Sequence, residues 1–306
     1  MPEHRLAGRQ AHGAHMDGKL NELRSRLLAQ LPGPGNFPTA IPNLRILRRD
    51  RVTELTRYFC TSCCVLIVQG CKQMQYGGEL LSYSRGQYLI ANAAIPVSGR
   101  IAEATHEEPC LGLELDFDTA IMTDLLYSHG LAPDDAGGSC ISVHDAPAEM
   151  LDAFLRLTAL LAKPASEQRI LAPLIVREIS FYLLSSPHGG ELRRIFTPDT
   201  RASNIARAIA LLRDRFTQKI SIDELARSVN MSPSSFYRCF RHITAVSPLQ
   251  YQKQLRLEEA KRLMLNGECN AATASFRVGY ESPAQFSREY KKMFGSPPRA
   301  DVRRLA

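Results

Sequence analysis

Two segments near the C-terminus share one pattern: a serine followed by a proline, and then aromatic residues at a spacing of four. Ser232 and Ser282 each stand where a hydroxyl can cap the first turn of a helix. The proline behind each serine fits the first helical position, where its missing N–H costs nothing. Counted from these serines, Phe236 aligns with Phe286. The recurrence predicts that the C-terminal part of the chain contains the same helical unit twice.

A second short helix precedes each capped helix. Ser221 and Glu224 have the spacing of a capping box, in which each side chain accepts a hydrogen bond from the other residue's backbone N–H. In the second copy, Gly279 can adopt the left-handed conformation of a tight turn. A short helix, a tight turn and a capped helix with a polar and basic outer face are typical of a helix-turn-helix.

One continuous helix is predicted between the two units, from Pro248 to about Leu265. Its apolar residues recur at helical spacing, with charged residues elsewhere. Such a helix spans roughly 25 Å. With the bulk of each unit added, the two capped helices could lie about one DNA turn apart, roughly 34 Å.

The charge of the chain is unevenly distributed. Residues 201–306 hold 19 of the 38 Lys and Arg residues, but only 9 of the 31 Asp and Glu residues. A basic block on an otherwise slightly acidic chain favours a polyanionic partner, bound through the release of counterions. A solvated basic surface would have the same composition, so charge alone does not decide between the two.

The first 200 residues have a different texture. We expect residues 1–16 to be a disordered leader and Asp17 to Leu31 to form a short helix, because its leucines recur at spacings of three and four. Short apolar runs broken by turns predict strands from residue 44 to 117, and helical periodicity predicts helices from 118 to about 185.

The fold class expected from these patterns is α+β. We expect three parts: a leader and short helix (1–36), a β-rich regulatory or dimerisation domain with C-terminal helices (37–190), and an all-α double helix-turn-helix domain (200–306).

Composition narrows the setting in which the protein works. The chain has no uncharged apolar run of about 18 residues, and its first residues lack the apolar stretch of a secretory signal. Eight cysteines in 306 residues are too few for a disulfide scaffold. We therefore expect a protein of the reducing cytoplasm with no membrane partner.

A set of short stretches in residues 205–306 forms a specific signature. They are SIDELA from Ser221, MSPSSFYR from Met231, VGYES from Val278, QFSR from Gln285, Phe294-Gly295 and Pro297-Pro298. Together they resemble the DNA-binding domain of the AraC/XylS transcription regulators over nearly its whole length. The family usually has glycine where this chain has Ala245, and an alanine in a left-handed turn costs about 1 kcal/mol.

The resemblance implies that the outer faces of the two capped helices bind DNA. The candidate DNA-binding residues are Ser234, Ser235, Tyr237, Arg238, Arg241, Ala284, Gln285, Ser287, Arg288 and Lys291. Arg238 and Arg288 could each grip the O6 and N7 atoms of a guanine, for about 1–3 kcal/mol of discrimination, or could instead contact phosphate. Four further cations are expected to face phosphate or solvent: Arg207, Lys253, Arg256 and Lys292.

Three stretches of the N-terminal half carry a second resemblance: Val68 to Lys72, Tyr83 to Leu89 and Ile95 to Gly99. They are similar to the cupin-like amino-terminal domain of one subgroup of AraC regulators. That resemblance implies a small sensing or dimerising barrel over roughly residues 40–118, followed by helices that pair subunits. It does not carry over a particular ligand.

A cupin enzyme would need a metal cage, usually two histidines close together on one strand with a glutamate and a later histidine. His106, His129 and His144 are well separated, and no His-x-His occurs. We therefore expect no enzyme activity, no metal and no cofactor.

Clustered cysteines are the remaining candidates for chemistry. A zinc site at Cys60 and Cys63 lacks a second pair of ligands, and alternation along a strand would separate Cys63 from Cys64. These thiols are either small buried hydrophobes or sensor groups. Cys71, beside Lys72 at a predicted hairpin, is the leading sensor candidate for an electrophile or oxidant, followed by Cys63 and Cys64.

The sequence thus predicts a transcription regulator, by resemblance an activator, that binds double-stranded DNA. RNA polymerase, a small-molecule or electrophile effector and a second copy of the chain are the other expected partners. Two alternatives stay open: a cupin-type enzyme tethered to DNA, and a constitutive regulator whose first domain only dimerises.

Overall fold

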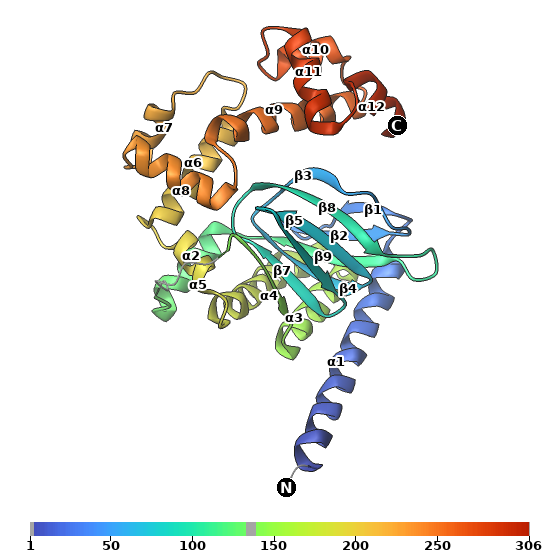
Figure 1. The fold of residues 1–306 in the computed structure, drawn as a ribbon. Coiled ribbons are helices and arrows are strands. Elements are labelled where there is room, and N and C mark those ends of the chain that lie inside the picture. Colours follow the sequence, from blue (N-terminus) through green and yellow to red (C-terminus); the bar gives the residue numbers. More distant parts are fainter. Residues whose placement is uncertain (1–2, 133–138, 306) are drawn as a thin grey trace. The chain divides into compact units, whose positions relative to one another are not determined.

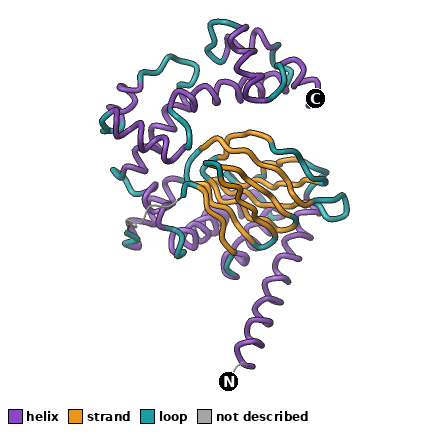
Figure 2. The backbone as a smooth tube through the Cα atoms, in the orientation of Figure 1, coloured by secondary structure: helices purple, strands orange, loops and turns teal. Residues whose placement is uncertain are grey.

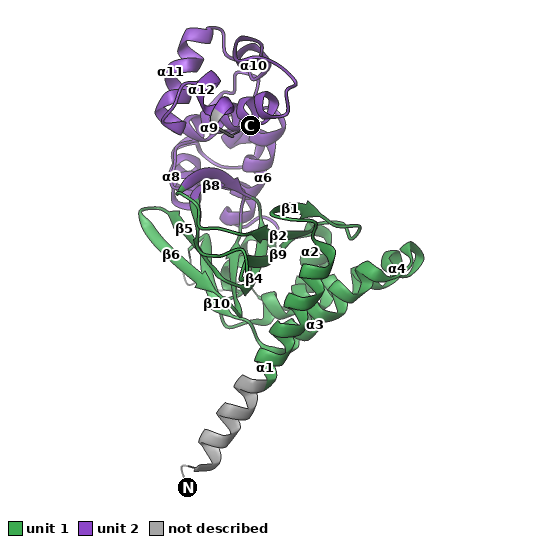
Figure 3. Ribbon diagram, turned by 90° about the vertical axis from the view of Figure 1, so that its right-hand side faces the viewer, with its two compact units in different colours: residues 1–55, 61–92, 99–197 green, residues 56–60, 93–98, 198–306 purple. Residues whose placement is uncertain are grey.

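A computed structural model describes residues 3–132 and 139–305 of the chain. They form two compact units, shown in Figure 3. Unit 1 comprises residues 1–55, 61–92 and 99–197, and unit 2 comprises residues 56–60, 93–98 and 198–306.

Ten strands form two sheets, visible as orange segments in Figure 2. The six-stranded sheet has the order β1-β2-β9-β4-β7-β10, and the four-stranded sheet has the order β3-β8-β5-β6. The strand bounds are β1 Gly35–Pro38, β2 Leu44–Arg49, β3 Thr56–Cys60, β4 Cys63–Gln69, β5 Cys71–Tyr76, β6 Glu79–Ser84, β7 Gln87–Ala91, β8 Ile95–Glu103, β9 Cys110–Asp116 and β10 Ile141–Asp145. The registers resolved within both sheets are antiparallel.

The turns between strands explain three of the glycines. Gly77 and Gly78 both have positive φ and join β5 to β6, as their hairpin signal predicts. Gly70, between β4 and β5, has φ +81°, and a Cβ there would lie 2.6 Å from the carbonyl oxygen of Glu103. Only glycine fits both the conformation and the space at this position.

Helices cover one side of the six-stranded sheet in unit 1 (Figure 1). Their bounds are α1 Glu3–Gln30, α2 Thr119–His129, α3 Ala148–Ala159, the 3-10 turn η1 Leu160–Ala162, α4 Ala165–Ser185 and α5 Gly190–Phe196. α1 packs on α3 and β4, and α4 packs on α2 and α3. The helix expected from Asp17 to Leu31 forms the C-terminal part of α1.

Unit 2 contains seven described helices: α6 Arg201–Asp214, α7 Ile222–Ser228, α8 Pro233–Thr244, α9 Pro248–Leu265, α10 Ala271–Arg277, α11 Pro283–Phe294 and α12 Pro298–Leu305. β3 and the start of β8 belong to the same unit. There the Tyr251 hydroxyl on α9 donates to the Ala94 carbonyl at 2.7 Å, and its ring meets that of Phe59 edge-on at 5.2 Å. The α+β fold class, with strands first and helices at the C-terminus, is confirmed.

Within the described ranges, no single helix is long and apolar enough to cross a membrane. The pair α4 and α5 meets the length and composition criteria only when taken together, and it is bent by 117°.

Ala245 ends α8 in the left-handed conformation, with φ 60°, as expected from the missing glycine. The equivalent C-cap of α11 is Gly295, with φ 81° and no heavy atom within 4 Å of a Cβ built there. The two positions therefore differ mainly in backbone strain.

We predict that Ala245→Gly raises the free energy of unfolding by about 0.5–1 kcal/mol, because glycine adopts this conformation without a steric cost. Gly295→Ala, the reverse change at the equivalent cap, should lower it by a similar amount. Urea unfolding of both variants and the parent protein measures the two effects, and a loss of stability in Ala245→Gly would contradict the prediction.

Candidate DNA-binding surface

The first helix-turn-helix comprises α7 and α8. The Ser221 hydroxyl accepts from the Glu224 N–H at 3.4 Å, and the Ser232 hydroxyl accepts from the Ser235 N–H at 3.4 Å. Asn230, in the turn between the helices, has φ 56°. Both predicted N-caps are thus present, and asparagine supplies the left-handed turn residue.

The second helix-turn-helix comprises α10 and α11. Gly279 makes its turn with φ +85°, and a Cβ there would lie 2.2 Å from the carbonyl oxygen of Thr217. Ser282 caps α11 by accepting from the Gln285 N–H at 3.4 Å. This turn therefore requires glycine twice, for its conformation and for the close approach of another chain segment.

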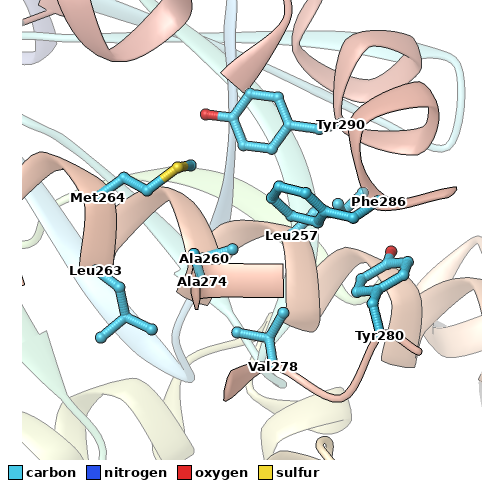
Figure 4. Close-up of a cluster of buried hydrophobic side chains, with 9 residues drawn as sticks. All are labelled: Leu257, Ala260, Leu263, Met264, Ala274, Val278, Tyr280, Phe286 and Tyr290. Carbon is cyan, nitrogen blue, oxygen red and sulfur yellow. The ribbon is translucent and has the colours of Figure 1, made fainter. Parts of the chain in front are cut away.

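Each helix-turn-helix has an aromatic core. In the first, Phe236 and Phe240 are fully buried, and the Phe240 ring meets Tyr251 of α9 edge-on at 5.5 Å. In the second, Phe286 and Tyr290 of α11 pack with Leu257 of α9 (Figure 4). The aromatic residues that recur at a spacing of four on α8 and α11 are therefore buried, and both cores use side chains of α9.

The outer faces of α8 and α11 are open to solvent. The candidates with exposed side chains are Ser234, Tyr237, Arg238, Arg241, Ala284, Gln285, Arg288 and Lys291, whereas Ser235 and Ser287 are half-buried. Within the described part of the chain, no ion pair involves Arg238, Arg241, Arg288 or Lys291. Four cationic groups on α8 and α11 are therefore available to a polyanion.

Arg256 does not belong to this open surface, so the expectation that it faces phosphate or solvent is wrong. Its guanidinium donates to the carbonyl oxygens of Phe216 at 2.7 Å, Gln218 at 3.0 Å and Gly279 at 3.0 Å. It thereby ties α9 to the segment before α7 and to the second turn. Sequence offered no signal for this role, because acceptors on distant backbone segments leave no local pattern.

Lys253 is also committed within the protein. Its Nζ lies 2.9 Å from a carboxylate oxygen of Glu289, which in turn accepts from the Tyr280 hydroxyl at 2.8 Å. The Lys253 side chain is nevertheless 50% exposed, as expected for a cation that faces phosphate or solvent, and Arg207 and Lys292 are exposed as well.

Two family models match the chain in tandem. The N-terminus of AraC-type transcriptional regulators matches residues 40–191, and a helix-turn-helix domain matches residues 225–304. The chain belongs to the AraC-type transcriptional regulators. The second match spans the two units whose caps and cores are described above.

Curated relatives align with about a third of this regulator. The transcriptional activator RhaS of Escherichia coli is 28% identical over 105 residues, covering 34% of this chain and 37% of RhaS. The regulator GbdR of Pseudomonas aeruginosa is 31% identical over 100 residues, covering 33% and 27%. The lactose operon transcription activator of Staphylococcus xylosus is 28% identical over 91 residues, covering 30% and 33%. The match spans only about a third of the length of each relative.

Solved structures extend the similarity of fold across the chain. ToxT from Vibrio cholerae, bound to an unsaturated fatty acid, is similar with a TM-score of 0.55 at 11% identity, covering 89% of this chain and 96% of ToxT. A ToxT structure without ligand has a TM-score of 0.57 at 10% identity, covering 88% and 100%. At such low identity the likeness concerns the fold alone.

The cysteines proposed as sensors lie inside unit 1. Cys63 and Cys64 are fully buried, and burial raises the pKa of Cys64 well above its usual range. Cys71 is 6% exposed, with its Sγ 3.3 Å from the Ser82 hydroxyl, so the exposed position expected at a hairpin is wrong. An electrophile would reach these thiols only if the surrounding strands opened.

One group among the described residues brings metal-ligand atoms together: Cys63, Glu114 and Asp116, whose atoms lie within 4.8 Å of one another. Arg45 already binds both carboxylates, at 2.8 Å to Glu114 and 2.6 Å to Asp116. Although burial alone would lower it, hydrogen bonds to the two carboxylates raise the pKa of Arg45. A fixed guanidinium between the carboxylates occupies the position that a cation would need.

A buried carboxyl group lies beneath the second recognition helix. Burial raises the pKa of Glu258 on α9 from 4.5 to about 7, with a further increase from Asp301 and an opposing effect of Lys261. Oε1 of Glu258 is buried and has no hydrogen-bond partner among the described residues. Asp301 is better satisfied, with the Tyr290 hydroxyl at 3.0 Å and Lys261 at 3.2 Å.

Because the folded state favours protonated Glu258, its contribution to stability is full below about pH 4.5 and is lost as the pH rises through 7. We predict that Glu258→Gln, a neutral isostere, raises the free energy of unfolding by up to about 3 kcal/mol at pH 8 and by little at pH 4. Urea unfolding at both pH values measures this difference, with exposed Glu281→Gln as the control. An equal effect of Glu258→Gln at both pH values would contradict the prediction.

Proposed function

We propose that this protein is a sequence-specific transcription regulator in which α8 and α11 enter two successive major grooves of DNA. The observation that carries the proposal is the pair of capped helices, each with an aromatic inner face and a cationic outer face, packed on one unbroken helix. α9 has 18 residues and is therefore about 27 Å long, which suits recognition helices spaced by about one DNA turn.

The base-reading residues in this proposal are the exposed ones on the two helices. Arg238 and Arg288 occupy equivalent positions in the two units and can each reach a guanine edge with both guanidinium donors. Tyr237, Ser234, Ala284 and Ser287 contact neighbouring bases or sugars, and Arg241 and Lys291 neutralise phosphates farther along each helix. Ser235 and Gln285 complete the contact surface near the helix starts.

The direction of regulation comes from the relatives. RhaS and the lactose operon regulator are named as transcription activators, which favours activation and contact with RNA polymerase for this chain. A protein that works on bacterial DNA acts in the cytoplasm. A small-molecule effector at unit 1 is supported by ToxT, whose structure contains a fatty acid in a similar fold.

We predict that Arg238→Ala lowers the ratio of specific to non-specific DNA affinity by about 5- to 150-fold, because a bidentate contact to guanine discriminates by about 1–3 kcal/mol. Fragments selected from the genome by the parent protein are compared with scrambled duplexes in a salt titration. Arg213→Ala, which removes an exposed cation from α6, is the control for net charge.

The same titration separates base reading from a phosphate contact. If Arg238 only binds phosphate, both affinities fall together and the slope of log K against log salt concentration decreases by about 1. If the parent protein binds no duplex at low salt, the proposed function itself fails.

We also propose that the regulator is a homodimer that pairs through α4. Ile170 and Leu174 lie one turn apart on this helix with exposures of 69% and 61%, and Phe181 continues the same face. Exposed apolar side chains in a row are typical of a surface that binds protein. A second copy of α4 offers a matching face, which satisfies the symmetry of a two-fold interface.

We predict that Leu174→Lys converts the dimer to monomer, because the interface would bury two like charges at its centre. Sedimentation equilibrium over a range of concentrations measures the mass. Val52→Lys, at another exposed apolar position of unit 1, should leave the dimer intact. A parent protein that stays monomeric at every concentration would refute the dimer.

A further inference from the structure

Unit 1 contains a polar cleft of about 710 Å³ where α1 meets three of the turns between strands. The turns are those that join β4 to β5, β6 to β7 and β8 to β9. This volume is in the range of small-molecule sites. Among the described residues that line the cleft, Ala104 alone has an apolar side chain, so the cleft suits a hydrophilic molecule.

The walls of the cleft are fixed by hydrogen bonds. Arg85, from the β6–β7 turn, donates to Asn21 Oδ1 at 3.0 Å and to the Asp17 carbonyl at 3.3 Å, both on α1. Its other terminal nitrogen donates to the Val68 carbonyl at 3.1 Å. One guanidinium therefore holds α1 against two strand ends, and the site exists before any ligand arrives.

Charged groups line the cleft without pairing one another. Arg24 of α1 has a buried Nε that lacks a hydrogen-bond partner among the described residues. Glu103, the last residue of β8, and Glu108, in the β8–β9 loop, have exposed side chains, and neither forms an ion pair within the described ranges. Arg24 likewise forms no ion pair with a described carboxylate, so the cleft presents one positive and two negative groups that are free to bind a ligand.

We propose that this cleft binds a small zwitterion of the amino-acid type. The carboxylate is received by Arg24, whose planar guanidinium matches it in geometry and charge. The ammonium group is received by Glu103 and Glu108. A purely anionic ligand would meet the two glutamates, and a purely cationic one would leave the charge of Arg24 uncompensated.

Binding itself depends only on the structure of unit 1. The regulatory meaning of the site rests on the proposed function, in which such a ligand is the effector. A ligand that bridges α1 and the three turns would stabilise their packing, because it binds only the folded arrangement.

The test uses the full chain without DNA. Each of the twenty L-amino acids and 4-aminobutyrate is titrated singly by calorimetry, with thermal unfolding as a second readout. We expect at least one of them to bind with a Kd of about 1 mM or lower and to raise Tm. For the tightest ligand, the analogue without the ammonium group and the analogue without the carboxylate should each bind at least about tenfold more weakly.

Variants assign the two ends of the ligand. Arg24→Gln should weaken binding at least about tenfold, while Arg51→Gln, at an exposed arginine outside the cleft, should not. Glu103→Gln together with Glu108→Gln should abolish the preference for the zwitterion over its deaminated analogue. Because both glutamates are exposed, this variant tests the site even if Arg24→Gln fails to fold.

Three results would overturn the proposal: no binding by any of these zwitterions, binding that Arg24→Gln leaves unchanged, or equal binding of the deaminated analogue to the parent protein. None of them bears on DNA binding, which is measured separately. Conversely, a protein that binds the zwitterion but no DNA would retain the site and refute the proposed function.

Discussion

The candidate DNA-binding surface on α8 and α11 depends on one unbroken helix, α9, which contributes side chains to both aromatic cores. Tyr251, near the start of α9, belongs to the core of the first helix-turn-helix, and Leu257, farther along, belongs to the core of the second. Between them, Arg256 binds carbonyl oxygens of the chain before α7 and of the turn at Gly279. A kink in α9 would break these contacts together, so the spacing of α8 and α11 follows from the rigidity of a single element.

The positions of helices α8 and α11 were predictable from local sequence rules. Ser232 and Ser282 cap their helices because a hydroxyl at this position satisfies a free N–H whatever the rest of the fold does. The left-handed conformation of Ala245 was expected from the resemblance instead, because the family usually has glycine at this position. At Ser221 only the serine half of the expected capping box is among the described bonds, whereas Ser247 and Gln250 form a complete one. Whether a predicted capping box forms depends on the other hydrogen-bond partners that its side chains meet in the fold, and sequence spacing does not reveal these partners.

Tertiary contacts decided what sequence could not. Arg256 and Arg238 are both arginines on helices of the helix-turn-helix domain, yet Arg256 donates to backbone carbonyls and Arg238 is open to solvent. Alternation placed Cys63 and Cys64 on opposite faces of β4, but both faces of that strand are buried, one against helices, so neither thiol is accessible. Asp301 of α12 is a charged residue, yet it is buried, where it accepts from the Tyr290 hydroxyl and pairs with Lys261.

The candidate cleft shows why similarity of fold does not identify a ligand: the side chains that line a site determine what it binds. ToxT and this chain have a similar fold at 11% identity, a level at which few wall residues coincide. An apolar ligand requires an apolar wall, because burial of hydrocarbon supplies its binding free energy. The cleft of this chain offers mainly charged and amide groups instead, and the guanidinium of Arg24 gains more from a carboxylate than from hydrocarbon. Its ligand must therefore be inferred from these groups, and the similarity of fold contributes only the position of the strands and helices that hold them.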